Sequence, residues 1–266
     1  MVPFSMRVLH AQFSMYLNKP NEALERLYTL QNTSNKILKN LESGKTEDGS
    51  IAELKPDDRE ASITLWNDRS KTLLFCIGNV LLQTREYEAA IKTYELILEK
   101  SEGDAVYLQS GIGRALLQLG NIKSAQHRFA KAEQAAKEDP NYKLQLIMNR
   151  AFLYLGTSNW KEALTQFNEV LKLNPQHLEA LNNKSVCLLY LCRLKDAISS
   201  LETAVWMQNN DSKDFLQNQL PLEGALSNLV TLYELESSRF MTKKQTLLHH
   251  IAGISGDGFD VTCLKM

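Results

Sequence analysis

The chain has 266 residues, of which 44% are hydrophobic and 8% aromatic, so it is long enough to bury a large apolar core. Its 30 basic and 31 acidic residues leave a formal net charge of −1, which excludes a global attraction to nucleic acid or to an anionic membrane. The longest unbroken apolar run, Val186 to Cys192, is far shorter than a membrane span, and the first residues contain no apolar signal-peptide core. We therefore expect no nucleic-acid partner and no direct membrane insertion.

The first elements in chain order predict an N-terminal helical hairpin over residues 1–42. Helical patterns run from Phe4 to Leu17 and from Asn21 to Leu41, and Pro20-Asn21 is the predicted turn between them. Within the second pattern, Ala23 mimics the small residue that recurs further along the chain.

A flexible insert is predicted over residues 43–56, where the helical period breaks. Its Ser, Gly, Asp and Lys content offers too little apolar surface to offset the entropy of ordering the segment. The following long helix is expected to begin near Asp57, which comes after Pro56 and could supply an N-cap side chain.

Residues 57–211 are predicted to form four tetratricopeptide repeats. A small residue recurs at spacings of 35, 38 and 34 residues, as Ala90, Ala125, Ala163 and Ala197. Each alanine has a bulky residue three positions before it (Tyr87, Ile122, Trp160, Leu194) and another four positions after it (Tyr94, Phe129, Phe167, Leu201). This pattern is typical of a repeat that builds two antiparallel helices per unit, here near 71–104, 106–140, 144–177 and 178–211.

The chain is expected to end with a capping hairpin over 212–252 and a tail over 253–266. Helical patterns run from Leu222 to Ser237 and from Thr242 to Ala252, and the period is then lost. The predicted fold class is therefore all-α: one right-handed tetratricopeptide-repeat α-solenoid with a capping hairpin at each end.

No catalytic, metal or cofactor site is predicted, because the residue types that carry such chemistry are scattered. Among five histidines only His249 and His250 are close, and adjacent helix positions diverge by about 100°. The four cysteines form no C-x-x-C pair, which favours free thiols in a reducing compartment. We expect a non-enzymatic protein.

A solenoid of this type can hold a partner in the groove lined by the first helix of each repeat. The phase of the repeats places eight candidate partner-binding residues there: Phe75, Asn79, Tyr107, Arg114, Gln145, Phe152, Asn182 and Asn183. The aromatic members could anchor a partner segment, or they could pack within the array. A clamp for a peptide carboxylate is incomplete, because Phe75 and Gly111 stand where a cation and an amide are wanted and Glu179 would repel the ligand.

Several stretches outside the bare repeat pattern are similar to one family. They are VPFSMRVLHAQF at 2–13, ASITLWNDR at 61–69, GIGRALLQLGNIKSAQ at 111–126, NNKSVCLLYLCRLKDAISSLE at 182–202, LYELESSRFMTKKQTLL at 232–248 and the closing DGFDVTCLKM. They resemble the C-terminal helical half of the family of the twelfth subunit of the TRAPP (transport protein particle) tethering complex. That family also carries a long N-terminal region which this chain does not contain.

The resemblance implies a scaffold subunit of the TRAPP III tethering and Rab-exchange assembly, acting in endoplasmic reticulum to Golgi transport and in autophagy. The implied neighbour is the large eleventh or eighth subunit, and a Rab1-type GTPase would be met only indirectly. The implied location is the cytoplasm, peripheral at the ER-Golgi intermediate compartment and Golgi, with a nuclear or kinetochore location in mitosis left open. Two alternatives are a co-chaperone-type adaptor that binds chaperone C-termini and a mitotic kinetochore adaptor.

Overall fold

The computed structural model describes residues 2–51, 55–100, 105–137, 139–206, 219–253 and 259–265, and these residues form helices and turns without a β-strand. They divide into two compact units, Met1–Asn121 and Ile122–Met266, which we call the N-terminal unit and the C-terminal unit. The division falls inside the second predicted repeat, so its two helices belong to different units. The sequence-based domain boundaries stay a prediction.

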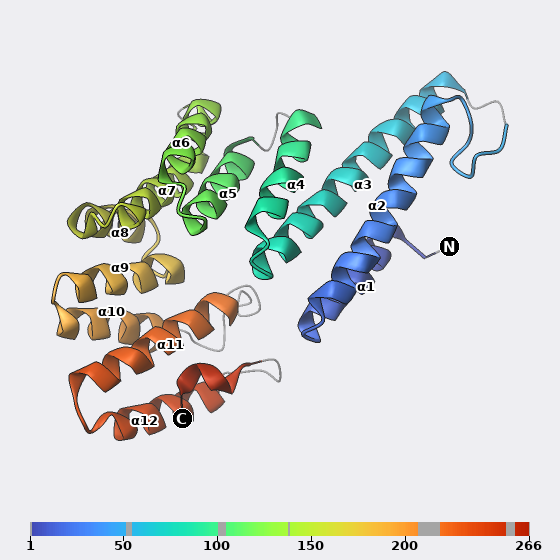
Figure 1. Ribbon diagram of the computed structural model, residues 1–266. Helices are drawn as coiled ribbons and strands as arrows, with labels where there is room; N and C mark the ends of the chain where they lie inside the picture. The colour runs from blue at the N-terminus through green and yellow to red at the C-terminus, as the bar shows by residue number, and fades with distance from the viewer. Residues whose placement is uncertain are drawn as a thin grey trace. The chain divides into compact units, whose positions relative to one another are not determined.

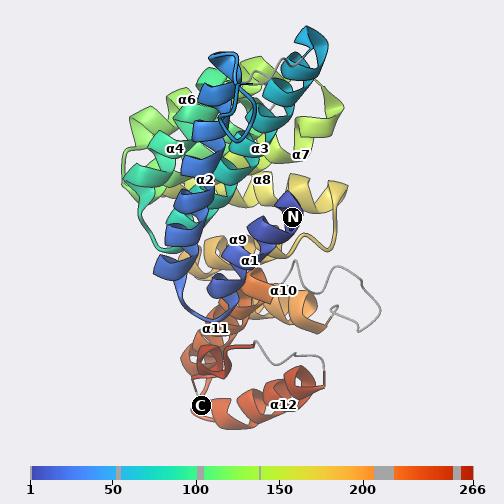
Figure 2. The ribbon, with the colours of Figure 1, turned by 90° about the vertical axis from the view of Figure 1, so that its right-hand side faces the viewer.

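The N-terminal unit contains α1 (Phe4–Tyr16), α2 (Pro20–Glu42), α3 (Pro56–Gln83), α4 (Tyr87–Lys100) and α5 (Ala105–Gln118). Each helix packs against the next one in the chain, and α1 runs beside α2 in both views of the ribbon (Figures 1 and 2). A buried apolar cluster joins these helices, with Leu27, Leu73, Ile77, Ile97 and Ile112 at its centre.

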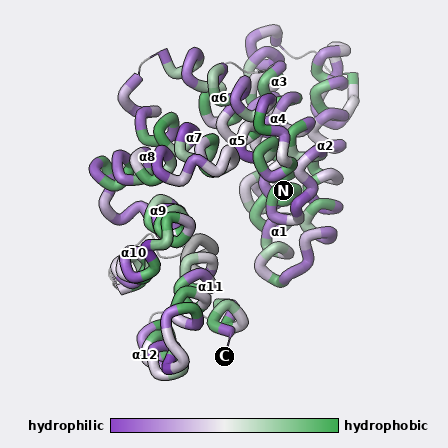
Figure 3. The backbone as a smooth tube through the Cα atoms, turned by 60° about the vertical axis from the view of Figure 1, so that its left-hand side comes forward, coloured by the Kyte–Doolittle hydropathy of each residue, from purple (hydrophilic) through white to green (hydrophobic). Residues whose placement is uncertain are grey.

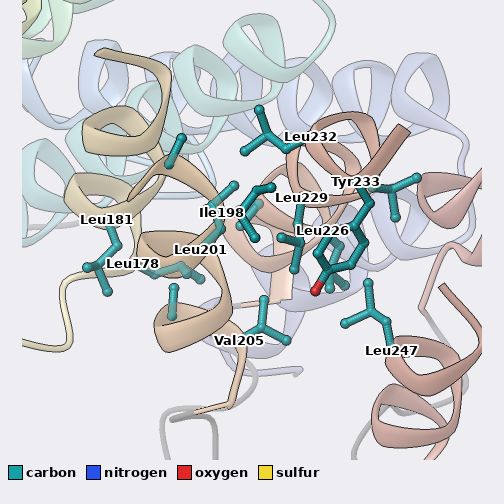
Figure 4. Packing of buried hydrophobic residues seen from close by; sticks show 14 of the residues in the cluster. Leu178, Leu181, Ile198, Leu201, Val205, Leu226, Leu229, Leu232, Tyr233 and Leu247 are labelled. Atoms are coloured by element: carbon teal, nitrogen blue, oxygen red, sulfur yellow. The ribbon is translucent and has the colours of Figure 1, made fainter. Parts of the chain in front are cut away.

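The C-terminal unit contains α6 (Ile122–Ala136), η1 (Pro140–Tyr142), α7 (Lys143–Gly156), α8 (Trp160–Leu173), α9 (Leu178–Tyr190), α10 (Leu194–Trp206), α11 (Gln219–Glu236), α12 (Phe240–Ala252) and η2 (Val261–Leu264), where η marks a 3-10 helix. Its largest apolar cluster gathers side chains of α9, α10, α11 and α12, as the sticks in Figure 4 show. Along the helices, apolar and polar stretches alternate, as expected where one face is buried (Figure 3).

The phase of the repeats is as predicted from the recurring alanines. Helices α4, α6, α8 and α10 begin at Tyr87, Ile122, Trp160 and Leu194, the bulky residue three positions before each alanine. All four alanines are completely buried, and so are the bulky residues four positions after them, apart from a few per cent of exposure. The alanines are therefore small because neighbouring helices pack directly against them.

Six helices of the described residues end in the same hydrogen-bonded turn, in which one residue has a positive φ: Asn18, Gly44, Arg85, Gly120, Ser158 and Cys192. After α9, for example, the Cys192 N–H donates to the Leu189 carbonyl at 2.9 Å and the Arg193 N–H donates to the Leu188 carbonyl at 2.8 Å. These are the two bonds of the Schellman motif, and they satisfy carbonyls that the helix end would otherwise leave unpaired.

Two predicted details at helix ends are wrong. Pro20 and Asn21 do not form the first turn, because Pro20 is the first residue of α2 and the turn lies over Leu17 to Lys19. At the first position of a helix a backbone N–H has no acceptor within the helix, so proline, which lacks that N–H, loses no hydrogen bond there. Asp57 is not an N-cap, because α3 already begins at Pro56, and the capping position, Lys55, makes no side-chain cap bond. Asp57 instead lies in the first turn of α3, where its negative charge interacts favourably with the positive end of the helix dipole.

The described part of the predicted insert, residues 43–51 and 55–56, contains a hydrogen-bonded turn. The Thr46 N–H donates to the Ser50 carbonyl at 3.0 Å, and Trp66 Nε1 of α3 donates to Glu47 Oε1 at 2.8 Å. Trp66 is itself buried, so the turn is attached to the core through that ring. Residues 52–54 lie outside the described residues, and the flexibility of 43–56 stays a prediction.

Candidate partner-binding surfaces

In the N-terminal unit, Phe75 and Asn79 lie one turn apart on α3 and both contact Tyr94 of α4. The rings of Phe75 and Tyr94 are 6.4 Å apart at 51°, and the Tyr94 hydroxyl donates to Asn79 Oδ1 at 2.8 Å. Phe75 is half-buried, whereas Asn79 is exposed. Phe75 thus packs within the array, and the Asn79 carbonyl oxygen already has an internal donor.

Burial of Tyr94 has an electrostatic consequence. It raises the pKa of the phenol to about 12, because the phenolate would lose its hydration inside the core. At neutral pH the hydroxyl is therefore a reliable donor to Asn79.

Tyr107 and Arg114 lie seven residues apart on α5, so two helical turns place them on the same face. Tyr107 is 55% exposed, the most open of the three predicted aromatic anchors, and Arg114 is half-buried. An exposed tyrosine and an arginine on one helix face are residue types that are enriched at protein interfaces.

In the C-terminal unit, Gln145 and Phe152 lie on α7 and both turn toward neighbouring side chains. Gln145 Nε2 donates to Asn149 Oδ1 at 3.2 Å, within the same helix. The Phe152 ring meets the buried Phe167 ring edge-on, with centroids 6.1 Å apart. Phe152 therefore contributes to the core of this repeat in the way that Phe75 does in its own unit.

Asn182 and Asn183 of α9 are also engaged inside the protein. Asn228 Nδ2 of α11 donates to Asn182 Oδ1 at 2.8 Å, and Asn183 Nδ2 donates to the Glu179 carbonyl at 2.8 Å. The bond made by Asn183 uses a side-chain N–H that a peptide carboxylate would otherwise accept from. Of the eight predicted residues, four lie in the N-terminal unit and four in the C-terminal unit.

An exposed apolar surface on α1 was not predicted from the sequence. Met6, Leu9, Phe13 and Tyr16 are 55%, 60%, 58% and 85% exposed, while Val8, Ala11 and Ser14 of the same helix are buried. The sequence does contain a pattern for this surface, because these four exposed residues follow one another at intervals of three, four and three positions. It was hidden because α1 is apolar on most of its circumference, so the period alone could not separate the buried side from the open one.

Docking of the tail was not predicted either. Leu264 of η2 is buried against α11, and Phe259 and Cys263 pack beside it. Lys244 of α12, only 2% exposed, donates to Glu234 Oε1 at 2.6 Å and to the Lys265 carbonyl at 2.9 Å. Lys265 Nζ donates in turn to Thr231 Oγ1 at 2.7 Å. No local period could indicate these contacts, because they join residues 10 to 34 positions apart.

The pKa values around this tail follow from the same contacts. The hydrogen bond from Lys244 holds the pKa of Glu234 below its ordinary value, since it stabilises the carboxylate. Burial, aided by the nearby Glu223 and Asp260 carboxylates, raises the pKa of the Cys263 thiol to about 11. Cys263 is therefore a neutral thiol at physiological pH and not an activated nucleophile.

Within the described residues, no group of three or more His, Cys, Asp or Glu side chains is placed to hold a metal ion. In the same part of the chain, no helix combines the length and the apolar character that crossing a bilayer requires.

The chain is similar to known proteins in both sequence and fold. The family model of the coatomer epsilon subunit matches residues 35–264. Trafficking protein particle complex subunit 12 of Mus musculus and that of Homo sapiens are each 42% identical over the whole of this chain, which spans 33% and 35% of their lengths. A tetratricopeptide repeat protein from Parabacteroides merdae superposes with a TM-score of 0.55 over 98% of this chain and 96% of its own, at 11% identity. That likeness confirms the predicted all-α tetratricopeptide-repeat fold, and the matches with subunit 12 confirm the resemblance noted in the sequence.

Proposed function

Because the chain belongs to the coatomer epsilon subunit family and resembles the C-terminal part of trafficking protein particle complex subunit 12, we propose that it is a scaffold subunit of such a particle. The observation that carries the proposal is the 42% identity to subunit 12 over the full chain, although the chain spans only about a third of those relatives. The proposed assembly is TRAPP III, and the proposed process is endoplasmic reticulum to Golgi transport and autophagy.

The structure supports a binding role through the kind of surface that it offers. Its helices bury one face and leave the rest as a broad exterior, which is the usual binding surface of repeat proteins. Exchange on a Rab1-type GTPase is assigned to other subunits of the assembly. The proposed direct neighbour is the large eleventh or eighth subunit, and the proposed location is the cytoplasmic face of the ER-Golgi intermediate compartment and Golgi.

Within the predicted groove, the Tyr107 side of α5 is the proposed contact. Phe75 and Phe152 pack against internal aromatic rings, whereas Tyr107 presents more than half of its surface. The co-chaperone alternative receives less support, because the side-chain N–H of Asn183 is bonded to the Glu179 carbonyl and is not directed at a ligand.

The test is a direct binding measurement between the purified chain and the isolated eleventh and eighth subunits. We expect one of them to bind, and Tyr107→Ser to weaken that binding by about tenfold or more, since truncated aromatic hot spots lose more than about 1 kcal/mol. Tyr28→Ser is the matched control, because Tyr28 is a similarly exposed tyrosine of the same unit that lies on α2.

Two results would count against this proposal. If neither subunit binds, the scaffold role in this assembly is wrong. If an acidic C-terminal peptide binds with salt-sensitive micromolar affinity and the subunits do not, the co-chaperone alternative replaces it.

A further inference from the structure

The outer side of α6 combines basic side chains with almost no acid. Lys123, His127 and Lys131 follow one another at intervals of four residues, so they lie on one side of the helix, and all three are exposed. Arg128, which is half-buried, adds a further positive charge. The chain as a whole has a net charge of −1, so the excess is local to α6. We call Lys123, His127 and Lys131 the basic face.

The described carboxylates near the basic face are bonded to other groups. Glu133 is the single acidic residue in the sequence of α6, and its Oε1 accepts a hydrogen bond from Arg150 Nε of α7 at 2.7 Å. Asp139, which follows the helix, accepts from the backbone N–H of Asn141 at 2.9 Å, and Glu138 lies outside the described residues. Among the described residues, neither lysine of the basic face has an ion-pair partner.

The first turn of α6 lacks an acidic residue that the corresponding helices of the next two repeats contain. Helices α6, α8 and α10 begin in the same way, with a bulky residue, a lysine and then the residue before the buried alanine. That third residue is Glu162 in α8 and Asp196 in α10, but Ser124 in α6. Because a carboxylate there would offset the positive end of the helix dipole, the first turn of α6 keeps the positive potential of both the dipole and its lysine.

The second lysine of the basic face, Lys131, is also specific to α6. By the repeat spacings of 38 and 34 residues, its equivalents are Glu169 in α8 and Thr203 in α10. Glu169 forms an ion pair with Lys172 at 2.6 Å, so α8 balances its charges where α6 does not. Like charges one turn apart are unfavourable within a helix, so the stability of α6 does not explain the basic face.

The other exposed residues of α6 limit the kind of partner that fits. Gln126, Ala130 and Gln134 are exposed beside the cations, and α6, all of whose residues are described, exposes no large apolar side chain. A partner helix docks through apolar positions, and so does an amphipathic contact with a membrane. An extended acidic peptide needs neither, because its carboxylates can meet the lysines and its backbone can bond to the glutamine amides.

We propose that the basic face of α6 is a docking site for an extended segment of a partner protein that is rich in glutamate or aspartate. Charge complementarity supplies the attraction, so the contact forms quickly and is sensitive to salt. This inference does not rest on the assembly proposed above. The contact proposed there uses Tyr107 of α5 and no residue of α6, so either proposal can fail without the other.

The experiment measures binding of the full 266-residue chain to a fluorescent peptide in which glutamate and serine alternate. A length of about eight residues suits it, because such a peptide, when extended, matches the roughly 22 Å length of α6. By fluorescence anisotropy we expect a Kd of about 10–100 µM at about 50 mM salt, and binding weaker by about fivefold at about 200 mM salt. The same peptide with glutamine in place of glutamate should not bind.

Two double variants separate the basic face from the charge of the whole chain. Lys123→Glu with Lys131→Glu should weaken peptide binding by about tenfold or more, because two attractions become repulsions. Lys161→Glu with Lys195→Glu is the matched control, since it makes the same charge change at the positions in α8 and α10 that correspond to Lys123, and it should bind within about threefold of the wild type. Circular dichroism and the melting temperature should stay close to the wild type for both, because all four lysines are exposed.

Three results would overturn the proposal. The first is a wild-type chain that does not bind the glutamate peptide at up to about 1 mM and about 50 mM salt. The second is an equal loss of binding in both double variants, which would assign the attraction to the charge of the whole chain. The third is a chain that binds vesicles containing about 30% phosphatidylserine through α6 and does not bind the peptide, because the ligand would then be an anionic membrane.

Discussion

The ring of Tyr94 in α4 lies directly on the Cα of Gly78 in α3, so closely that a Cβ at position 78 would stand 2.5 Å from Tyr94 Cε1 and 2.9 Å from its Cζ. The ring cannot easily move aside, because it is buried and its hydroxyl is bonded to Asn79. Gly78 is therefore required by a close helix-helix approach, and Phe75 and Asn79 complete the environment of the ring.

Gly78→Ala should consequently destabilise the N-terminal unit. We expect a loss of about 1–3 kcal/mol in the free energy of unfolding, the usual range for overpacking a core, although alanine is the better helix former. Gly111→Ala is the control, since a Cβ there would lie 3.9 Å from the opposite edge of the same ring, which is ordinary contact. Urea denaturation should show a loss of stability for Gly78→Ala only, with Gly111→Ala unchanged or stabilised by up to about 1 kcal/mol.

The Schellman turns predict a change of opposite sign. Ser158 and Cys192 have φ values of 58° and 60°, a left-handed conformation that is unfavourable for side chains with a Cβ. Replacing either by glycine should raise the free energy of unfolding by about 0.5–1 kcal/mol, because relief of that strain exceeds the added entropy of the unfolded chain.

Gly120 allows the opposite substitution in the same kind of turn, from glycine to alanine. Its φ is 76°, and a Cβ added at this position would have no atom within 4 Å, so Gly120→Ala tests the backbone alone. We expect a loss of about 1 kcal/mol, measured by the same denaturation. Stabilisation by this alanine would contradict the role assigned to the left-handed residues.

The buried ammonium of Lys244 makes docking of the tail sensitive to acid. The pKa of Glu234 is lowered in the folded protein by its bond to Lys244, so its contribution to stability is present above the unfolded value of about 4.5 and is lost as the pH falls through the folded pKa. Hydrogen exchange of the amides of residues 259–265 should therefore accelerate below pH 4.5 beyond the intrinsic effect of pH. In Lys244→Met this additional pH dependence should disappear, and the tail should exchange faster at neutral pH.

Leu264 should be the apolar anchor of the same tail. Leu264→Asp should release η2 from α11, because a carboxylate would replace a side chain that is 1% exposed in the apolar cluster. Limited proteolysis should then cut the tail earlier than in the wild type. Val261→Asp, in the same η2 but 55% exposed, should leave the cutting rate unchanged.

Sequence periodicity determined the helices of this protein and the residues at which many of them begin. The sequence predicted four buried alanines, Ala90, Ala125, Ala163 and Ala197. This was possible because each repeat of a solenoid packs on its neighbours in the same way, so the same residue type recurs at nearly constant spacing. The closing segments indicated the family for the opposite reason: they depart from the repeat pattern, so their similarity is specific to that family.

Only the tertiary structure decided which of the candidate surfaces are open. The helical period places Phe75, Phe152 and Tyr107 on the side of their helices that was expected to line the groove. The first two nevertheless meet Tyr94 and Phe167 from the following helices, and only Tyr107 is mainly exposed. Exposure of the apolar side chains of α1 and burial of Leu264 are decided in the same way. Burial depends on contacts between residues far apart in the chain. A periodic pattern predicts the face of the helix on which a side chain lies, but it does not predict which residue of another helix covers that face.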